Sequence, residues 1–178
     1  MMGLGDDSNT VHLIDFGLTR FFIDPNTRQH IPEKKYRHLV GTCLFCSPNS
    51  HKGIELTRRD DLITLGYVIL QFVRGNLPWQ SVRTGDAKER YKLVGQMKIA
   101  WTNAKLCEGL PPQFKAYMDY VTGLSFDQPG NFQMMKKLIT DCARQNNIDL
   151  FDNTFDWSLR LSQLDEQSPS DLANVNKN

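Results

Sequence analysis

The sequence has no long apolar run, no marked excess of either charge, and few cysteines. Without an apolar stretch of about 18 residues it contains no segment typical of a membrane span, and its first residues lack a secretory signal pattern. A formal net charge of +1 argues against a general binder of nucleic acid or other polyanions. We therefore expect a cytoplasmic or nuclear protein with no nucleic-acid or membrane partner.

The few cysteines lie at positions 43, 46, 107 and 142, and we expect them to be reduced thiols. Cys43 and Cys46 have the spacing of half a zinc site or of a redox pair. However, no second pair of Cys or His stands at metal-ligand spacing, so structural thiols are the favoured interpretation. His12 and His51 are interpreted as structural or surface residues, because the sequence shows no acid or thiol beside them in a catalytic pattern.

The chain has 178 residues, of which 40% are hydrophobic and 23% charged, as expected for one ordinary domain with a single core. Residues 1–158 are predicted to form this domain. Residues 159–178 form a polar tail that we predict to be disordered. A short apolar segment at 11–16 predicts a buried strand, and the long irregular stretch at 18–47 is typical of a functional or mobile segment.

Helical patterns dominate the rest of the chain and predict a mainly α fold. Thr57 with Asp60 resembles a capping box, and Gly75 ends the helix that follows. Apolar residues recur at helical spacing through this helix, which we predict to be buried nearly all round. Three further helices are predicted: one beginning at Asp86, one from the Pro111–Pro112 pair to Gly123, and one from Phe132 to Gln145.

Residues 13–18 read Leu-Ile-Asp-Phe-Gly-Leu, an apolar segment that delivers a carboxylate to a Gly turn. Protein kinases hold the magnesium ion of bound ATP in this way. Asp15 is therefore a candidate magnesium ligand, and Asp15, Phe16 and Gly17 are candidate cofactor-binding residues. The competing interpretation is an Asp at an ordinary turn, followed by a core aromatic. Either interpretation predicts that Phe16 is mostly buried.

Six motifs follow one another along the chain: Asp-Phe-Gly at 15–17, Gln-His-Ile-Pro at 29–32, Gly-Thr at 41–42, Arg-Arg-Asp-Asp-Leu at 58–62, Leu-Gly-Tyr at 65–67 and Leu-Pro-Trp-Gln at 77–80. In this order they resemble the casein kinase 1 family of serine/threonine kinases. The resemblance covers roughly residues 2–157. Ile-Asp-Pro at 23–25 and Lys-Glu-Arg-Tyr at 88–91 lean toward the gamma branch of the family.

The resemblance implies the C-lobe portion of a kinase domain, with a short β segment before the Asp-Phe-Gly turn and no N-lobe. The intact family binds ATP and Mg²⁺ and phosphorylates Ser and Thr in acidic contexts. This chain starts just after the expected catalytic loop. We therefore expect it to be inactive alone and to bind ATP and Mg²⁺ weakly. The alternative is an inactive, pseudokinase-like C-lobe remnant that binds partners.

The resemblance also implies contacts with other molecules. Protein substrates or scaffold proteins are the expected partners, and the face left open by the absent N-lobe predicts aggregation or a stabilising partner. Arg37, Gly41, Thr42 and Arg90 are the implied substrate or anion site. The competing interpretation of the basic stretch at 28–38 is a solvated loop.

Two further residues have implied roles, and some positions depart from the family pattern. Asp61 corresponds to an acid that accepts hydrogen bonds from backbone N–H groups of the catalytic loop. Trp79 is expected to have a structural role and to pack against the predicted buried helix that ends at Gly75. Leu44 stands where the family has a basic residue, so recognition of phosphorylated substrates is weakened. Ser81 stands where the family has Gly, and Pro48 removes a backbone N–H near the expected substrate groove. Both departures also weaken the expected recognition of substrate.

Overall fold

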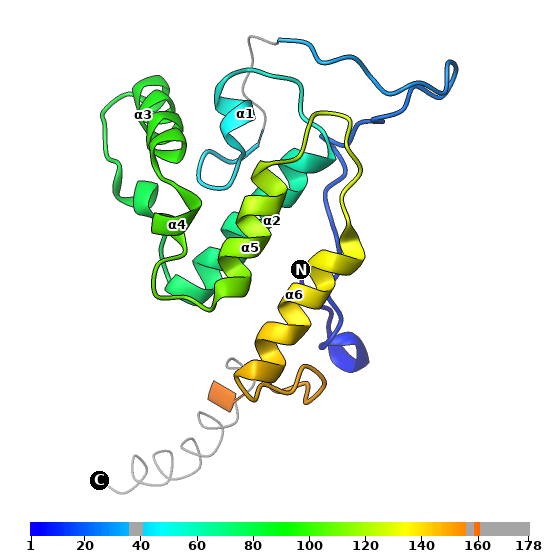
Figure 1. The fold of residues 1–178 in the computed structure, drawn as a ribbon, viewed down its shortest axis with the longest axis vertical. Coiled ribbons are helices and arrows are strands. Elements are labelled where there is room, and N and C mark those ends of the chain that lie inside the picture. The colour runs from blue at the N-terminus through cyan, green and yellow to red at the C-terminus, as the bar shows by residue number, and fades with distance from the viewer. Residues whose placement is uncertain (36–40, 156–158, 161–178) are drawn as a thin grey trace, which may run out of the picture. The chain divides into compact units, whose positions relative to one another are not determined.

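The computed structural model describes residues 1–35, 41–155 and 159–160, and it divides the chain into two compact units (Figure 1). We call residues 15–146 the main unit, and residues 1–14 with 147–178 the terminal unit. The terminal unit contains the short helix η1 (Gly5–Asp7) and a loop closed by hydrogen bonds such as Gly3 N to Thr10 O, 2.9 Å. Within the described ranges, all the longer helices belong to the main unit.

The described residues are mainly helical, as the sequence predicts. The elements of the main unit are α1 (Pro48–His51), α2 (Arg58–Arg74), η2 (Pro78–Ser81), α3 (Ala87–Ala100), α4 (Asn103–Leu106), α5 (Pro112–Thr122) and α6 (Phe132–Gln145). Within the described ranges, β structure is limited to isolated bridges that join Met2 to Val11, Ile23 to His30 and Lys35 to Ile54. The predicted strand at 11–16 thus contributes only Val11 to a bridge.

Helix α2 begins and ends where the sequence predicts. The Thr57 backbone N–H donates to Asp60 Oδ2 at 2.9 Å, so the acid of the predicted capping box satisfies a free N–H at the helix start. The Thr57 hydroxyl donates to the Phe126 carbonyl at 2.7 Å, which ties this start to a distant loop. Gly75 ends the helix at φ 77°, a left-handed conformation that suits glycine.

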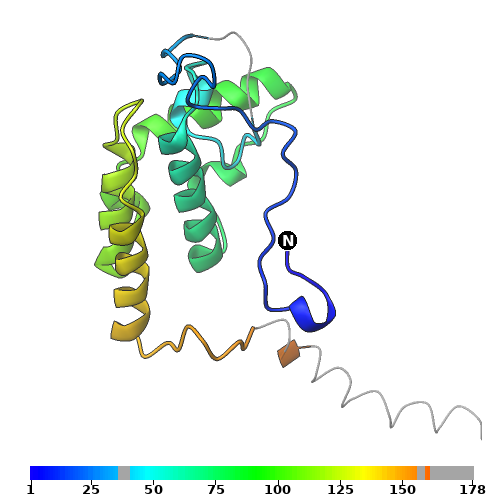
Figure 2. The same ribbon diagram turned by 90° about the vertical axis from the view of Figure 1, so that its right-hand side faces the viewer.

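Helix α5 packs between α2 and α6; it lies in front of α2 in Figure 1, and Figure 2 shows these two helices side by side. Gly66 permits the close approach of α2, because a Cβ there would lie 2.5 Å from Met118 Sδ and 3.0 Å from Tyr117 Cε1. The Tyr117 hydroxyl donates to the Leu62 carbonyl at 2.9 Å across the same interface. The most buried side chains of the core are Leu70, Leu77, Trp79, Val94, Met118 and Val121.

The other predicted helix starts are confirmed, and those of α3 and α6 have side-chain caps. The Asp86 carboxylate accepts hydrogen bonds from the backbone N–H groups of Lys88 and Glu89 and begins α3. Pro112 is the first residue of α5. Asn131 Oδ1 accepts from Met134 N at 3.0 Å and begins α6. Each signal is local in sequence, which explains why the sequence alone predicts these boundaries.

One expectation about α2 is wrong. The helix is not buried nearly all round, since Phe72 is 80% exposed and Leu65 and Val73 are 47% and 48% exposed. Helical spacing identifies apolar residues but does not say whether every face has a neighbour. In the described part of the chain, one apolar face of α2 is open to solvent.

Candidate functional site

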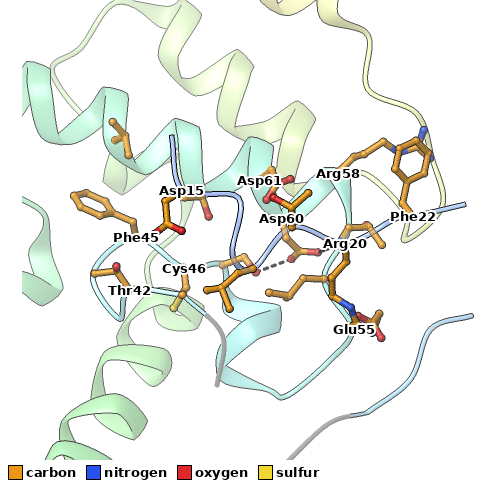
Figure 3. Close-up of a pocket in the computed structure, with 18 residues that line it drawn as sticks. Asp15, Arg20, Phe22, Thr42, Phe45, Cys46, Glu55, Arg58, Asp60 and Asp61 are labelled. Carbon is orange, nitrogen blue, oxygen red and sulfur yellow. Dashed lines mark hydrogen bonds and ion pairs between the residues drawn. The ribbon is translucent and has the colours of Figure 1, made fainter. Parts of the chain in front are cut away.

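A cavity of about 510 Å³ opens in the main unit beside the start of α2. Three segments line it: residues 15–22, the loop at 41–47, and the stretch from Glu55 into α2 (Figure 3). Asp15, Gly41, Thr42 and Asp61, which the sequence singles out for separate roles, all line this one space. The cavity therefore brings together residues that are far apart in sequence.

Asp15 has a left-handed backbone, with φ 62°. Aspartate tolerates this conformation better than most residues because its short polar side chain can bond to nearby backbone groups. Here the Gly17 backbone N–H donates to Asp15 Oδ1 at 3.2 Å. The turn thus holds one carboxylate oxygen of Asp15 in place at the wall of the cavity.

The prediction that Phe16 is mostly buried is wrong, since the side chain is 62% exposed. Burial would require a neighbouring strand or helix to place apolar surface over the ring. Residues 12–16 form no strand in the structure, so the ring stays open to solvent. Neither Phe16 nor Gly17 lines the cavity; Asp15 does.

Asp60, in the first turn of α2, holds two segments against the start of this helix. These segments are the loop at 41–47 and α1, which follows the loop. The Asp60 carboxylate is 3% exposed and accepts hydrogen bonds from Ser47 Oγ at 2.6 Å, Asn49 Nδ2 at 2.9 Å and Thr57 N at 2.9 Å. Arg59 Nε lies 3.6 Å from Asp60 Oδ2. A buried carboxylate needs such partners, and these fix the loop and the helix relative to each other.

Asp61 is exposed at the cavity wall, next to the buried Asp60. Its pKa is raised, first because surrounding protein atoms displace solvent from the carboxyl and second because the Asp60 charge is close. Partial desolvation in a concave surface accounts for this shift even though the side chain remains accessible. A cation or hydrogen-bond donor in the cavity would therefore interact favourably with Asp61.

The segment after the Asp-Phe-Gly turn is held against the α2 start by two arginines. Arg20 Nη1 donates to Glu55 Oε1 at 3.0 Å, and Glu55 is only 5% exposed. The Arg58 guanidinium lies 4.2 Å from the centroid of the Phe22 ring, a cation–π contact. Figure 3 shows both pairs at the edge of the cavity. These contacts fix the wall that carries Asp15.

The proposed anion-site residues do not all meet in the cavity. Gly41, at φ 93°, and Thr42 line it, but Arg90 lies half-buried on α3 and does not. Arg37 lies outside the described residues. The structure therefore does not place Arg90 at the cavity, and the anion-binding role of these residues stays a prediction.

Two contacts of the 41–47 loop were not predicted from the sequence. Cys46 Sγ lies 3.4 Å from His51 Nε2, so the fold places a thiol beside this half-buried histidine. Burial lowers the pKa of His51 to about 4 and raises the pKa of Cys46, so both groups are uncharged near pH 7. Lys98 Nζ donates to the backbone of the same loop. Its one sequence signal is its position four residues after the buried Val94, on the inward face of α3.

Magnesium is the ion that the motif implies, and the donor chemistry of the cavity fits it in part. No group of three or more His, Cys, Asp and Glu side chains within the described ranges could hold a metal ion. Mg²⁺ keeps several waters and is commonly held by one or two carboxylates plus phosphate oxygens. Asp15 can supply one such ligand. Among the helices described, none has the length and apolarity to span a membrane.

Comparison with known proteins finds curated relatives of this chain. The chain is 39% identical over 153 residues to casein kinase I homolog 2 of Schizosaccharomyces pombe, covering 86% of this chain and 35% of that relative. No family model matches the chain. The chain thus spans about a third of the length of the curated relative it matches.

The helical main unit and the Asp-Phe-Gly turn beside the α2 start define the class of the protein as a C-lobe portion of a protein kinase fold. Within that class, the identity over most of the chain shows that it is a casein kinase 1 family kinase region. The recognition and the mainly α fold predicted from the sequence are therefore confirmed.

Proposed function

We propose that this region is part of a serine/threonine protein kinase of the casein kinase 1 type. Such an enzyme transfers the terminal phosphoryl group of ATP to a Ser or Thr of a protein substrate that has acidic residues nearby in its sequence. The observation that carries the proposal is the shared cavity of Asp15, Thr42 and Asp61, in a chain 39% identical to a casein kinase I homolog.

In this proposal the cavity residues have separate roles. When bound, ATP would supply the phosphoryl group, and Mg²⁺ would supply the positive charge that neutralises the charge developing on it. Asp15 would hold the metal through the carboxylate that Gly17 N–H orients. Asp61 would accept backbone N–H groups of the catalytic loop, which its position at the cavity wall allows. Gly41 and Thr42 would border the substrate peptide.

The 178-residue polypeptide by itself is proposed to be inactive. Its sequence has no Gly-rich phosphate loop, no lysine in a Val-Ala-Ile-Lys context and no His-Arg-Asp catalytic loop. Phosphoryl transfer depends on all of these groups together. Binding of Mg²⁺ and ATP by the polypeptide alone should likewise be weak, since Asp15 would act without the second metal ligand.

A chimera tests the kinase proposal directly. The part of casein kinase I homolog 2 that precedes the matched region is fused ahead of residue 1, and phosphorylation of casein is measured. We expect activity that falls at least about 100-fold in Asp15→Asn, because the metal ligand is lost. Asp127→Asn is the matched control, since Asp127 is exposed and outside the cavity. A folded chimera without activity would contradict the proposal.

A second candidate function, a binding module without catalysis, is favoured by the exposed apolar face of α2. Phe72, Leu65 and Val73 leave apolar surface open, and large exposed apolar patches mark interaction sites or aggregation. Robust phosphorylation of casein by the chimera would count against this candidate. An inactive chimera that remains well folded would support it.

A further inference from the structure

Lys98 is a buried cation whose donors are directed at one loop. The residue is 4% exposed, and Nζ donates to the carbonyls of Cys43 at 2.8 Å and Cys46 at 2.7 Å. A third contact reaches Cys46 Sγ at 3.9 Å. Lysine is almost never fully buried unless it is paired. Here the partners are backbone carbonyls, so the interaction fixes the course of the chain and does not depend on a partner's charge.

Two aromatic side chains complete the environment of Lys98 and hold the same loop. Nζ lies 5.3 Å from the centroid of the Trp79 ring and 5.4 Å from that of Tyr67, both within cation–π range. Trp79 Nε1 donates to the Leu44 carbonyl at 2.8 Å. Buried side chains therefore hold the carbonyls of residues 43, 44 and 46 from the core side.

The loop is also closed by its own backbone. The N–H groups of Phe45 and Cys46 both donate to the Thr42 carbonyl, at 3.0 and 2.9 Å. Thr42 and Phe45 line the cavity that contains Asp15 (Figure 3). The contacts of Lys98 on the inner side of the loop thus determine how the outer side borders the cavity.

We propose that Lys98 is a positioning residue that holds the 41–47 loop in the shape that receives the substrate peptide. The proposal that this loop receives a peptide rests on the proposed kinase function. Lys98 does not itself contact the substrate, because its donors are occupied by the loop and its ammonium is buried. Removing the ammonium should therefore loosen a defined backbone segment and weaken peptide binding while the rest of the fold persists.

Amide hydrogen exchange on the 178-residue chain tests the positioning step without requiring activity. In Lys98→Met, we expect exchange in residues 41–47 to become about tenfold faster, while α5 and α6 keep their rates. Lys92→Met is the matched control, because Lys92 is exposed on the same helix. Unchanged exchange in the loop would overturn the proposal. Equal acceleration throughout the chain would also overturn it, since that result indicates general destabilisation.

A second variant tests the proposal independently in case Lys98→Met does not fold. Trp79→Phe keeps an aromatic ring in the core but removes the N–H that donates to Leu44. Exchange in residues 41–47 should again rise selectively, by a smaller factor. No selective change in this variant would contradict the view that core-side donors hold the loop.

Steady-state kinetics of the chimera test the link to the substrate. Lys98→Met should raise KM for a peptide substrate about tenfold and leave KM for ATP and kcat within about twofold. A loss in kcat with unchanged peptide KM would overturn the positioning role. If the unmodified chimera is inactive, the kinase proposal fails, and the exchange experiment still decides whether Lys98 holds the loop.

Discussion

At the scale of single residues, the environment of Lys98 predicts how stability depends on pH. Burial is the largest effect and lowers the pKa of Lys98 from 10.5 to about 8, while the nearby thiols oppose the shift. Between these two pH values the unfolded chain binds more protons than the folded chain, so this group makes stability rise with pH. The other titratable groups around it are Cys43, Cys46, His51, Tyr67 and Tyr91.

The corresponding experiment compares wild type with Lys98→Met by denaturant unfolding from pH 7 to pH 10.5. The free energy of unfolding of wild type should rise relative to that of the variant, by up to about 3 kcal/mol over this window. The comparison is made between the two proteins because the raised pKa values of Cys46 and Tyr91 act in both and oppose the trend. A difference that stays constant with pH would contradict a lowered Lys98 pKa.

Asp60 provides the second prediction at this scale. Asp60→Ala leaves the buried donors of Ser47 and Thr57 and the half-buried donor of Asn49 without their acceptor. The loss of a buried, multiply hydrogen-bonded carboxylate should lower the free energy of unfolding by about 3 kcal/mol. Urea unfolding measures the effect. In Asp61→Asn, which changes the exposed neighbour, the change should stay within about 0.5 kcal/mol. If both substitutions lowered the free energy of unfolding equally, the conclusion that Asp60 is structural and Asp61 is not would be wrong.

At the scale of elements, the contact between α2 and α5 depends on Gly66. A Cβ at this position would lie 2.5 Å from Met118 Sδ, and Met118 is 1% exposed and has little room to move. Gly66→Ala should therefore destabilise by about 1–3 kcal/mol, although alanine favours a helix. Thermal unfolding of a double-mutant cycle with Met118→Ala tests the cause. If the whole penalty persists when the Met118 side chain is removed, a clash with Met118 is not its cause.

Local signals explain which elements the sequence predicts correctly. Asp60, Gly75, Asp86 and Asn131 act on backbone groups within four residues, so the limits of α2, α3 and α6 follow from short stretches of sequence. The position of Lys98 against the Cys43 and Cys46 carbonyls depends on residues more than fifty positions away. No local pattern encodes that contact, and the contact of Cys46 with His51 likewise requires the folded loop.

The candidate site could be predicted only in part, because short motifs identify its residues but not their surroundings in the fold. Of the residues that the two motifs single out, Asp15, Gly41 and Thr42 line one cavity, whereas Phe16 and Gly17 do not. The exposure of Phe16 could not be predicted in this way. It depends on whether a neighbouring segment covers the ring, and residues 12–16 form no strand. A family motif specifies the residue types, whereas burial is a property of the whole neighbourhood.

At the scale of the whole molecule, the open face of α2 should control self-association. Phe72 is 80% exposed on the helix that also carries the half-exposed Leu65 and Val73, so this helix presents apolar side chains to solvent. Phe132 on α6 is 62% exposed and provides a matched control on another helix. We expect the 178-residue chain to associate at micromolar concentrations, and we expect Phe72→Glu to shift it toward monomer.

Sedimentation velocity or light scattering over a concentration series measures this shift. Phe72→Glu should lower the apparent association constant about tenfold or more, because a charge on the apolar face must be desolvated in the associated state. The melting temperature should change little, since the Phe72 side chain contributes little buried area to the fold. Phe132→Glu should leave association unchanged. If both substitutions reduce association equally, general surface charge is responsible, and the α2 face has no special role in holding copies or partners.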